Sequence, residues 1–160
     1  MNPKILSTKF YGFDSFAGFG DLKDDDKHPF YTDENFATNM PTVQRRVQRV
    51  AGSIKFKMVP GFFSDSLKNG AEQYSIKKSR IIFIDSDTYS SANEALTFCI
   101  PTIQEGTFVI LDDYYSYRGH EQKGVARAFS EFISQSNIKV RRVFTYGMGG
   151  AVYVISEITK

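Results

Sequence analysis

The sequence predicts an α/β fold with a mostly parallel sheet that closes in an antiparallel hairpin. Expected strands alternate with expected helices along the chain, the pattern of parallel sheets with helical crossovers. Residues 80–85 and 107–112 contain unbroken apolar runs, which are typical of strands covered on both faces. Only residues 146–150 link the last two expected strands, and so short a link requires an antiparallel pair.

The first half of the chain contains two expected strands and one expected helix. Residues 9–14 (KFYGFD) are a strand of aromatic residues that ends on an acid. Residues 42–51 place valines at helical spacing with arginines opposite, which predicts an amphipathic helix, and Gly52 is expected to end it. Residues 54–59 (IKFKMV) alternate apolar and basic side chains, which indicates a strand.

The second half predicts a βαβ unit followed by a helix and a hairpin. The two apolar strands flank a helix expected over residues 90–100, and the crossover between them is expected to be right-handed. A second amphipathic helix is expected over residues 124–133. The closing strands are expected at residues 140–145 and 151–156.

A long acidic loop, residues 18–29, follows the first expected strand. It carries two glycines, a proline and the consecutive acids Asp24, Asp25 and Asp26. Loops of this length in compact domains are usually functional or mobile. We therefore expect this loop to be one or the other.

Composition predicts a single globular domain over residues 1–160. The chain is 41% hydrophobic, which is enough material for one core. It has 20 Lys and Arg against 18 Asp and Glu, so the net charge of +2 gives no reason to expect nucleic acid or a membrane as a partner. A single cysteine, Cys99, excludes an intramolecular disulfide and favours the cytoplasm. No apolar run approaches the ~18 residues of a membrane span.

Acidic residues follow both apolar strands of the βαβ unit. Asp85 ends one strand, with Asp87 two residues later, and Asp112 and Asp113 end the other. If the strands are neighbours, their ends lie about 5 Å apart, so the carboxylates converge and raise one another's pKa. A divalent cation removes that penalty, and an all-oxygen ligand set suits Mg²⁺, Ca²⁺ or Mn²⁺. We favour Asp85, Asp112 and Asp113 as ligands, leaving Asp87 to cap the next helix or to lie outside the ligand set.

Two known uses of such acids fit less of the chain. The DSDT sequence resembles the nucleophile motif of haloacid-dehalogenase phosphatases, but only 27 positions separate residue 85 from residue 112, too few for the intervening segments of that family. FIDSDT also resembles the metal-binding DxD of glycosyltransferases that use nucleotide sugars. Those enzymes need a longer domain and a nucleotide-binding strand near the start. A DxD-type glycosyltransferase or phosphotransferase is the alternative function.

Four sequence blocks together resemble the macrocin O-methyltransferase family. They match that family in order and approximate spacing: FYGFDSFAGFGD at residues 10–21, GFFSDSL at 61–67, FIDSDTYSSANEAL at 83–96, and EGTFVILDDY at 105–114. Each block is weak alone, whereas four in order are fairly specific. The resemblance implies a Rossmann-like class I methyltransferase that uses S-adenosylmethionine and a divalent metal to methylate a hydroxyl of a sugar or another small-molecule acceptor.

The resemblance also implies roles for particular residues. Asp14 is assigned to the ribose of S-adenosylmethionine, and Asp65 and Ser66 are assigned to the region of its adenine. Asp85, Asp112 and Asp113 match the metal triad. Asp85 is also the implied general base for the acceptor hydroxyl.

One feature of the family has no counterpart near the start of the chain. Family members bind the methionine end of the cofactor with a glycine-rich loop after their first strand, and only thirteen residues precede Asp14. We therefore expect a methyltransferase sheet without its first strand, in an N-terminally truncated domain. Such a sheet leaves two strand edges unpaired, which makes a homo-oligomer possible and the activity of the isolated chain doubtful.

Overall fold

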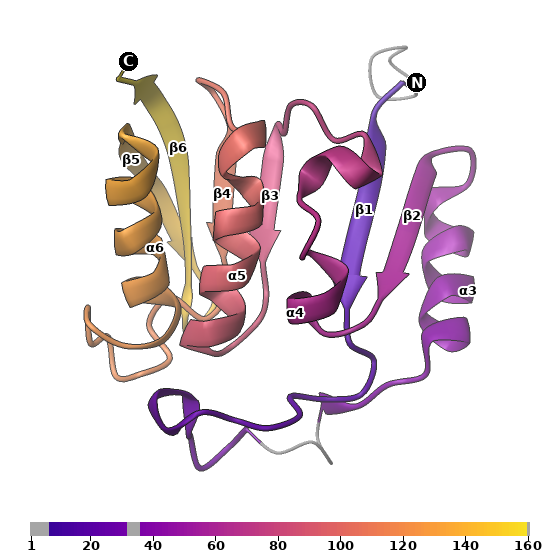
Figure 1. Ribbon diagram of the computed structural model, residues 1–160, viewed down its shortest axis with the longest axis horizontal. Helices are drawn as coiled ribbons and strands as arrows, with labels where there is room; N and C mark the ends of the chain where they lie inside the picture. Colours follow the sequence, from indigo (N-terminus) through magenta and orange to yellow (C-terminus); the bar gives the residue numbers. More distant parts are fainter. Residues whose placement is uncertain (1–6, 32–35, 160) are drawn as a thin grey trace. The chain divides into compact units, whose positions relative to one another are not determined.

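The computed structural model describes residues 7–31 and 36–159, which fall into two compact units (Figure 1). Of these residues, unit 1 holds 7–22, 28–31 and 36–68, and unit 2 holds 23–27 and 69–159. The short acidic segment 23–27 thus belongs to unit 2, although the residues on both sides of it belong to unit 1.

Unit 1 is built on a two-stranded parallel sheet. Strand β1 (Lys9–Asp14) pairs with β2 (Lys55–Pro60), and Phe10 lies opposite Phe56. Helix α3 (Met40–Ala51) precedes β2, and the single-turn helix α4 (Phe63–Ser66) follows it. The two strands and the helix expected in this half of the sequence are confirmed.

The ends of α3 have clear local causes. The Asn39 side chain accepts a hydrogen bond from the Thr42 N–H at 3.1 Å, which caps the first turn. The chain leaves the helix at Gly52, whose φ of +57° is a conformation that favours glycine. No residue of α3 is buried, and Val50, which the valine pattern placed on the packed face, is 87% exposed. The helical prediction was right, but the valine face is at most partly buried.

Unit 2 is built on a four-stranded mixed sheet with the order β3-β4-β6-β5. Strands β3 (Ile81–Ile84) and β4 (Phe108–Leu111) are parallel neighbours, as the βαβ prediction requires. Strands β5 (Ile138–Tyr146) and β6 (Gly150–Ile158) form the predicted antiparallel hairpin, and β6 also pairs antiparallel with β4.

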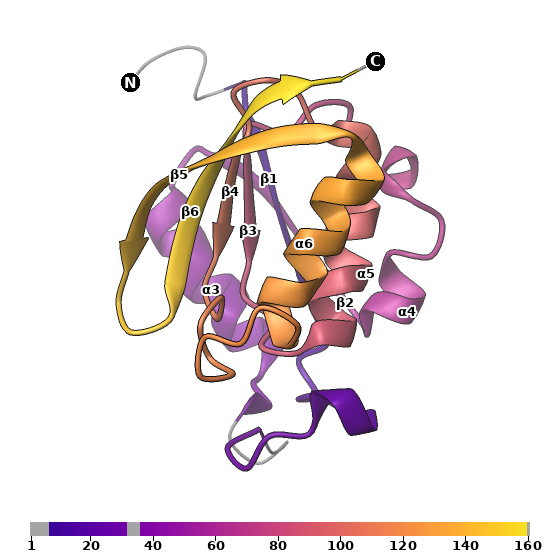
Figure 2. The same ribbon diagram turned by 90° about the vertical axis from the view of Figure 1, so that its left-hand side faces the viewer.

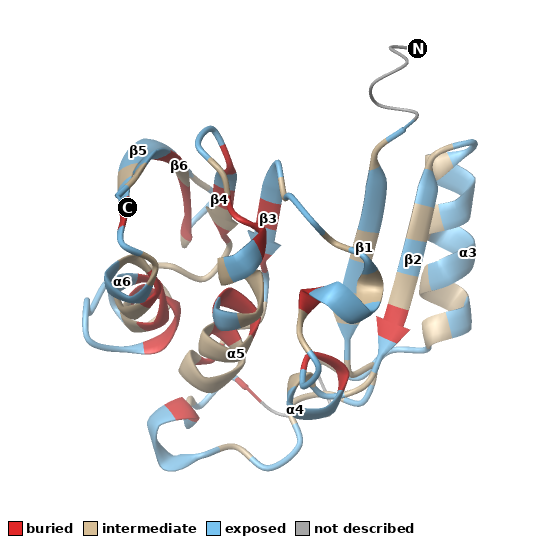
Figure 3. Ribbon diagram, turned by 45° about the horizontal axis from the view of Figure 1, so that its top comes forward, coloured by how far each residue is buried: buried red, intermediate tan, exposed pale blue. Residues whose placement is uncertain are grey.

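Two helices cover one face of this sheet and form the core of unit 2 (Figure 2). They are α5 (Tyr89–Cys99) and α6 (Gly124–Ser136), which also pack against each other. Figure 3 shows buried residues on these helices and on the strands beside them. The largest buried apolar side chains of this core are Leu96, Val109, Leu111, Phe129, Phe132 and Ile155.

The other face of the unit 2 sheet differs from the sequence prediction. Ile82 and Ile84 are buried, whereas Ile81 and Phe83 are 62% and 54% exposed. Since alternate residues of a strand point to opposite faces, β3 is covered on one face only. The apolar run predicted a strand covered on both faces, but both α5 and α6 lie on the same side of the sheet (Figure 2).

Among the described residues, no helix is long and apolar enough to cross a membrane.

Candidate functional site

Three carboxylates meet where β3 and β4 end. Oxygen atoms of Asp85, Asp87 and Asp113 all lie within 4.8 Å of one another. The parallel pairing places Ile84 opposite Leu111, and the Asp112 N–H continues the ladder with a 2.9 Å bond to the Ile84 carbonyl. The residues that follow the two strands therefore leave the sheet at the same edge, where ligands of open α/β sheets bind.

A tight turn brings Asp87 into this cluster. Asp87 has a φ of +59°, in the left-handed region, and the Thr88 N–H bonds to the Ser86 carbonyl at 2.5 Å. Thr88 then caps α5, because its hydroxyl oxygen accepts a hydrogen bond from the Ser91 N–H at 3.3 Å. The chain thus turns back after Asp85 instead of staying extended, and Thr88 is the capping residue, the role for which the sequence analysis considered Asp87.

Asp112 and Asp113 have different surroundings. The Tyr146 hydroxyl donates a 2.6 Å hydrogen bond to Oδ1 of Asp112, and the Ser116 hydroxyl donates one of the same length to Oδ1 of Asp113. The metal ligands predicted from the sequence are Asp85, Asp112 and Asp113. The structure brings together Asp85, Asp87 and Asp113, with Asp112 beside them and bound to Tyr146.

The cluster is electrostatically unfavourable without a cation. Burial, followed by the charge of Asp113 and a hydrogen bond to it, raises the pKa of Asp87 to about 7, and the charges of Asp85 and Asp112 raise it further. Oγ of Ser86, the residue between Asp85 and Asp87, is buried and has no hydrogen-bond partner among the described residues. Converging carboxylates and an unsatisfied hydroxyl oxygen are hard oxygen donors. They fit a divalent cation such as Mg²⁺.

Tyr146 is a residue of the site that sequence reasoning did not single out. It ends β5, and a Cβ placed on Gly150 across the hairpin turn would overlap its ring. Burial first, and the bond to Asp112 second, raise the pKa of the Tyr146 phenol. The available signal in the sequence was the glycine at position 150, which leaves room for the Tyr146 ring.

The residues assigned to the cofactor lie in unit 1. Asp14 is the exposed end of β1, and its Oδ1 accepts a hydrogen bond from the Phe16 N–H at 2.6 Å. Asp65 is exposed on α4, whereas Ser66 is buried and its hydroxyl donates to the Gly61 carbonyl at 3.3 Å. Asp14 therefore lies exposed at the end of a strand, a position that suits ligand binding, whereas the Ser66 hydroxyl is hydrogen-bonded to the backbone of its own segment.

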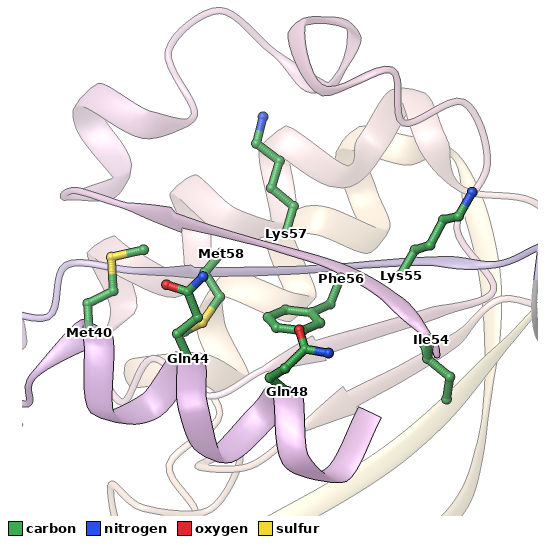
Figure 4. A pocket seen from close by; sticks show the side chains of 8 residues that line it. All are labelled: Met40, Gln44, Gln48, Ile54, Lys55, Phe56, Lys57 and Met58. Atoms are coloured by element: carbon green, nitrogen blue, oxygen red, sulfur yellow. The ribbon is translucent and has the colours of Figure 1, made fainter. Parts of the chain in front are cut away.

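A groove of about 420 Å³ lies between α3 and β2 in unit 1 (Figure 4). Its lining contains methionine, glutamine and lysine side chains but no acid, histidine or cysteine: Met40, Gln44, Gln48, Ile54, Lys55, Phe56, Lys57 and Met58. It lacks the carboxylates that a site for a hard cation needs. The acids of unit 2 are therefore the better candidate site.

Comparison with known protein families identifies the chain. The Macrocin-O-methyltransferase (TylF) family matches residues 4–144. The chain belongs to this family. The resemblance inferred from the four sequence blocks is therefore confirmed, and Tyr146 lies just beyond the part of this TylF-family chain that matches.

Individual relatives agree with the family assignment. Mycinamicin III 3''-O-methyltransferase from Micromonospora griseorubida is 30% identical over 113 residues, which cover 63% of this chain and 42% of that protein. The TylF-family chain thus spans about two fifths of the length of this curated relative.

Solved structures show the same fold. The O-methyltransferase NovP superposes with a TM-score of 0.71 at 22% identity, over 92% of this chain and 60% of NovP. CalS11, a calicheamicin methyltransferase, gives 0.67 at 16% identity, over 93% of this chain and 61% of CalS11. An O-methyltransferase from Bacillus cereus, solved in complex with SAH, gives 0.54 at 12% identity, over 93% of this chain and 74% of that protein. The predicted Rossmann-like class I methyltransferase fold is confirmed.

Proposed function

We propose that this chain contributes to an S-adenosylmethionine-dependent O-methyltransferase that acts on a hydroxyl of a sugar or sugar-bearing small molecule. The observation that carries the proposal is the meeting of Asp85, Asp87 and Asp113 at the carboxyl ends of two parallel strands. The family assignment favours methyl transfer over the glycosyl or phosphoryl transfer that an Asp-Ser-Asp sequence also suggests. The mycinamicin relative, NovP and CalS11 are all named as methyltransferases, which supports the same class of reaction.

A hard divalent cation is part of the proposal. Asp85, Asp87 and Asp113 would hold it, and Asp112, which the family resemblance places in the triad, lies beside them. When bound, the cation supplies a positive charge that lowers the pKa of the acceptor hydroxyl. Asp85 is the exposed acid of the three and is proposed to accept the hydroxyl proton as the oxygen takes up the methyl group. Ser116 and Tyr146 hold Asp113 and Asp112 in place through their hydrogen bonds.

S-adenosylmethionine is proposed to meet this chain at its ribose and adenine. Asp14 would accept hydrogen bonds from the two ribose hydroxyls, with Asp65 and Ser66 near the adenine. The glycines after β1 lead into the short turn Asp24–Asp26, and those at 147–150 lead directly into β6, so neither group opens an α-helix that could hold the methionine end. The proposal therefore includes no contact between this chain and that end.

The proposal also covers the cellular location of the chain and its partners. A net charge of +2 and the single cysteine support a cytoplasmic enzyme whose partner is a small molecule, with neither nucleic acid nor membrane involved. We also retain the proposals that residues 1–160 are part of one methyltransferase domain and that the chain can form homo-oligomers.

The proposed function is tested by isothermal titration with S-adenosylmethionine and Mg²⁺, each alone and then together. We expect Mg²⁺ to bind the native chain and to lose most of its heat in Asp113→Asn, whereas Asp24→Asn, an exposed acid of the long loop, should bind like the native chain. No heat from either ligand with a folded chain would contradict the proposal. A rise in melting temperature with a nucleotide sugar, and none with S-adenosylmethionine, would favour the glycosyltransferase alternative.

A further inference from the structure

Asp26 is a buried carboxylate that the proposed reaction does not use. It is the last of three consecutive acids in the 3₁₀ turn η1 (Asp24–Asp26), the indigo turn at the bottom of Figure 2. The side chains of Asp24 and Asp25 are 94% and 74% exposed, whereas Asp26 is 2% exposed. A fully buried carboxylate is uncommon, because its desolvation has to be offset by specific bonds.

The hydrogen-bond partners of Asp26 lie in the two segments that follow the acid cluster, which are the start of α5 and the loop after Asp113. Its Oδ1 accepts a hydrogen bond from the Ser90 N–H at 3.0 Å, in the first turn of α5. Its backbone carbonyl accepts one from the Tyr117 hydroxyl at 3.3 Å, in the loop after Asp113. Since Thr88 already accepts the Ser91 N–H, the first turn of α5 is capped twice, once locally and once from 64 residues away.

Neighbouring contacts hold the acidic turn in this place. Asp25 pairs with Arg127 at 3.4 Å, and the Arg127 guanidinium lies 4.0 Å from the centre of the Tyr89 ring. The Tyr89 hydroxyl donates to Glu131 at 2.9 Å. A Cβ on Gly124 would overlap the Tyr117 ring, so glycine at this position gives that tyrosine room. The turn is therefore fixed against the first turns of both α5 and α6.

The first turn of α5 begins directly after the strained turn that carries Asp87. Asp87 holds a left-handed φ of +59°, a conformation that few non-glycine residues adopt. We propose that Asp26 is a positioning residue: its bonds to Ser90 and Tyr117 hold the turn at residues 85–88 and the loop after Asp113 together, and so set the carboxylates of the metal cluster. The inference deepens the proposed function and rests on it for the cation readout alone.

Two Asp26 variants and one matched control test this inference. Asp26→Ala removes the acceptor for Ser90, whereas Asp26→Asn keeps an oxygen at the same position. Asn39→Ala removes a local side-chain cap from α3, in unit 1, where Asn39 accepts the Thr42 N–H at 3.1 Å. If Asp26→Ala does not fold, Asp26→Glu is measured in its place, because the longer side chain moves the carboxylate away from Ser90.

Each variant is measured without and with metal. In the metal-free chain, amide hydrogen exchange over residues 85–91 should be roughly tenfold faster in Asp26→Ala and near native in Asp26→Asn and Asn39→Ala. The dissociation constant for Mn²⁺, followed by electron paramagnetic resonance, should rise by about 10-fold in Asp26→Ala only.

The outcomes separate this inference from the proposed function. Native exchange in Asp26→Ala, or equal effects of Asp26→Ala and Asn39→Ala, would overturn the positioning role. Faster exchange in Asp26→Ala alone, together with a native chain that binds no Mn²⁺, would support only the hold of Asp26 on the turn at residues 85–88 and would remove the metal from the proposed function.

Discussion

The pKa of Asp87 links the geometry of the acid cluster to the stability of the fold. Its ordinary value is 3.8, and burial with the neighbouring acids raises it to about 7. The folded chain therefore binds this proton more tightly than the unfolded chain does. By linkage, the contribution of Asp87 to stability is present below about pH 4 and is lost as the pH rises to about 7.

We predict that the metal-free chain melts at a lower temperature as the pH rises through this window. Asp87→Asn removes the ionisable group and should flatten this part of the profile, and Mg²⁺ should restore stability to the native chain at the upper end. Thermal unfolding followed by circular dichroism measures both effects. A native profile that is flat, or identical to that of Asp87→Asn, would show that Asp87 is not held neutral by its neighbours.

Gly150 is a glycine that the packing around the site requires. A Cβ there would overlap the Tyr146 ring, which donates to Asp112. Gly150→Ala should therefore lower the free energy of unfolding by about 1–3 kcal/mol through overpacking. Gly12→Ala in β1 is the control, because nothing lies within 4 Å of a Cβ at that position. Urea denaturation compares the two, and an equal effect at both sites would contradict the overlap.

At the scale of elements, most of the fold could be predicted from local pattern. The apolar runs that become β3 and β4, the helices α5 and α6, and the short hairpin link all depend on neighbours in sequence. The boundaries shifted by only a few residues, as with α3, which begins at Met40 ahead of the predicted residue 42.

What could not be predicted depends on contacts between distant residues. The position of Asp87 requires a left-handed turn that its sequence does not specify. The burial of Asp26 depends on Ser90, 64 residues away, so the acidic loop looked only functional or mobile. The bond from Tyr146 to Asp112 likewise spans 34 residues. The sequence therefore indicates the acids of the candidate site but not the residues that hold them in place.

One face of the β3–β4 pair exposes apolar side chains. Ile81 lies opposite Phe108 and Phe83 opposite Ile110, so these apolar side chains share one face. Within the described residues β3 is hydrogen-bonded to a strand on one side only. An apolar face beside an open edge favours association.

We predict that the chain associates with a second copy of itself through this face. Phe83→Lys should shift the mass measured by light scattering toward the monomer. Val50→Lys, an equally drastic change at an exposed position of α3, should leave the mass unchanged. A monomeric native chain at all concentrations would contradict this prediction.

At the scale of the whole molecule, the chain divides its residues between two units that are proposed to carry different tasks. Unit 1 holds Asp14, Asp65 and Ser66, which are assigned to the cofactor, and unit 2 holds the acid cluster and the turn around Asp26. The chain covers 60% of NovP and 42% of the mycinamicin relative. The chemistry of unit 2 can be tested by cation binding alone, without the acceptor.

The most direct test of the central claim is a Mn²⁺ titration followed by electron paramagnetic resonance. The native chain should bind one equivalent of Mn²⁺, and Asp87→Asn and Asp113→Asn should each weaken that binding by about 10-fold or more. Asp24→Asn, which changes an exposed acid of the η1 turn, should bind like the native chain. Equal Mn²⁺ binding by all four proteins would contradict a cation site at Asp85, Asp87 and Asp113.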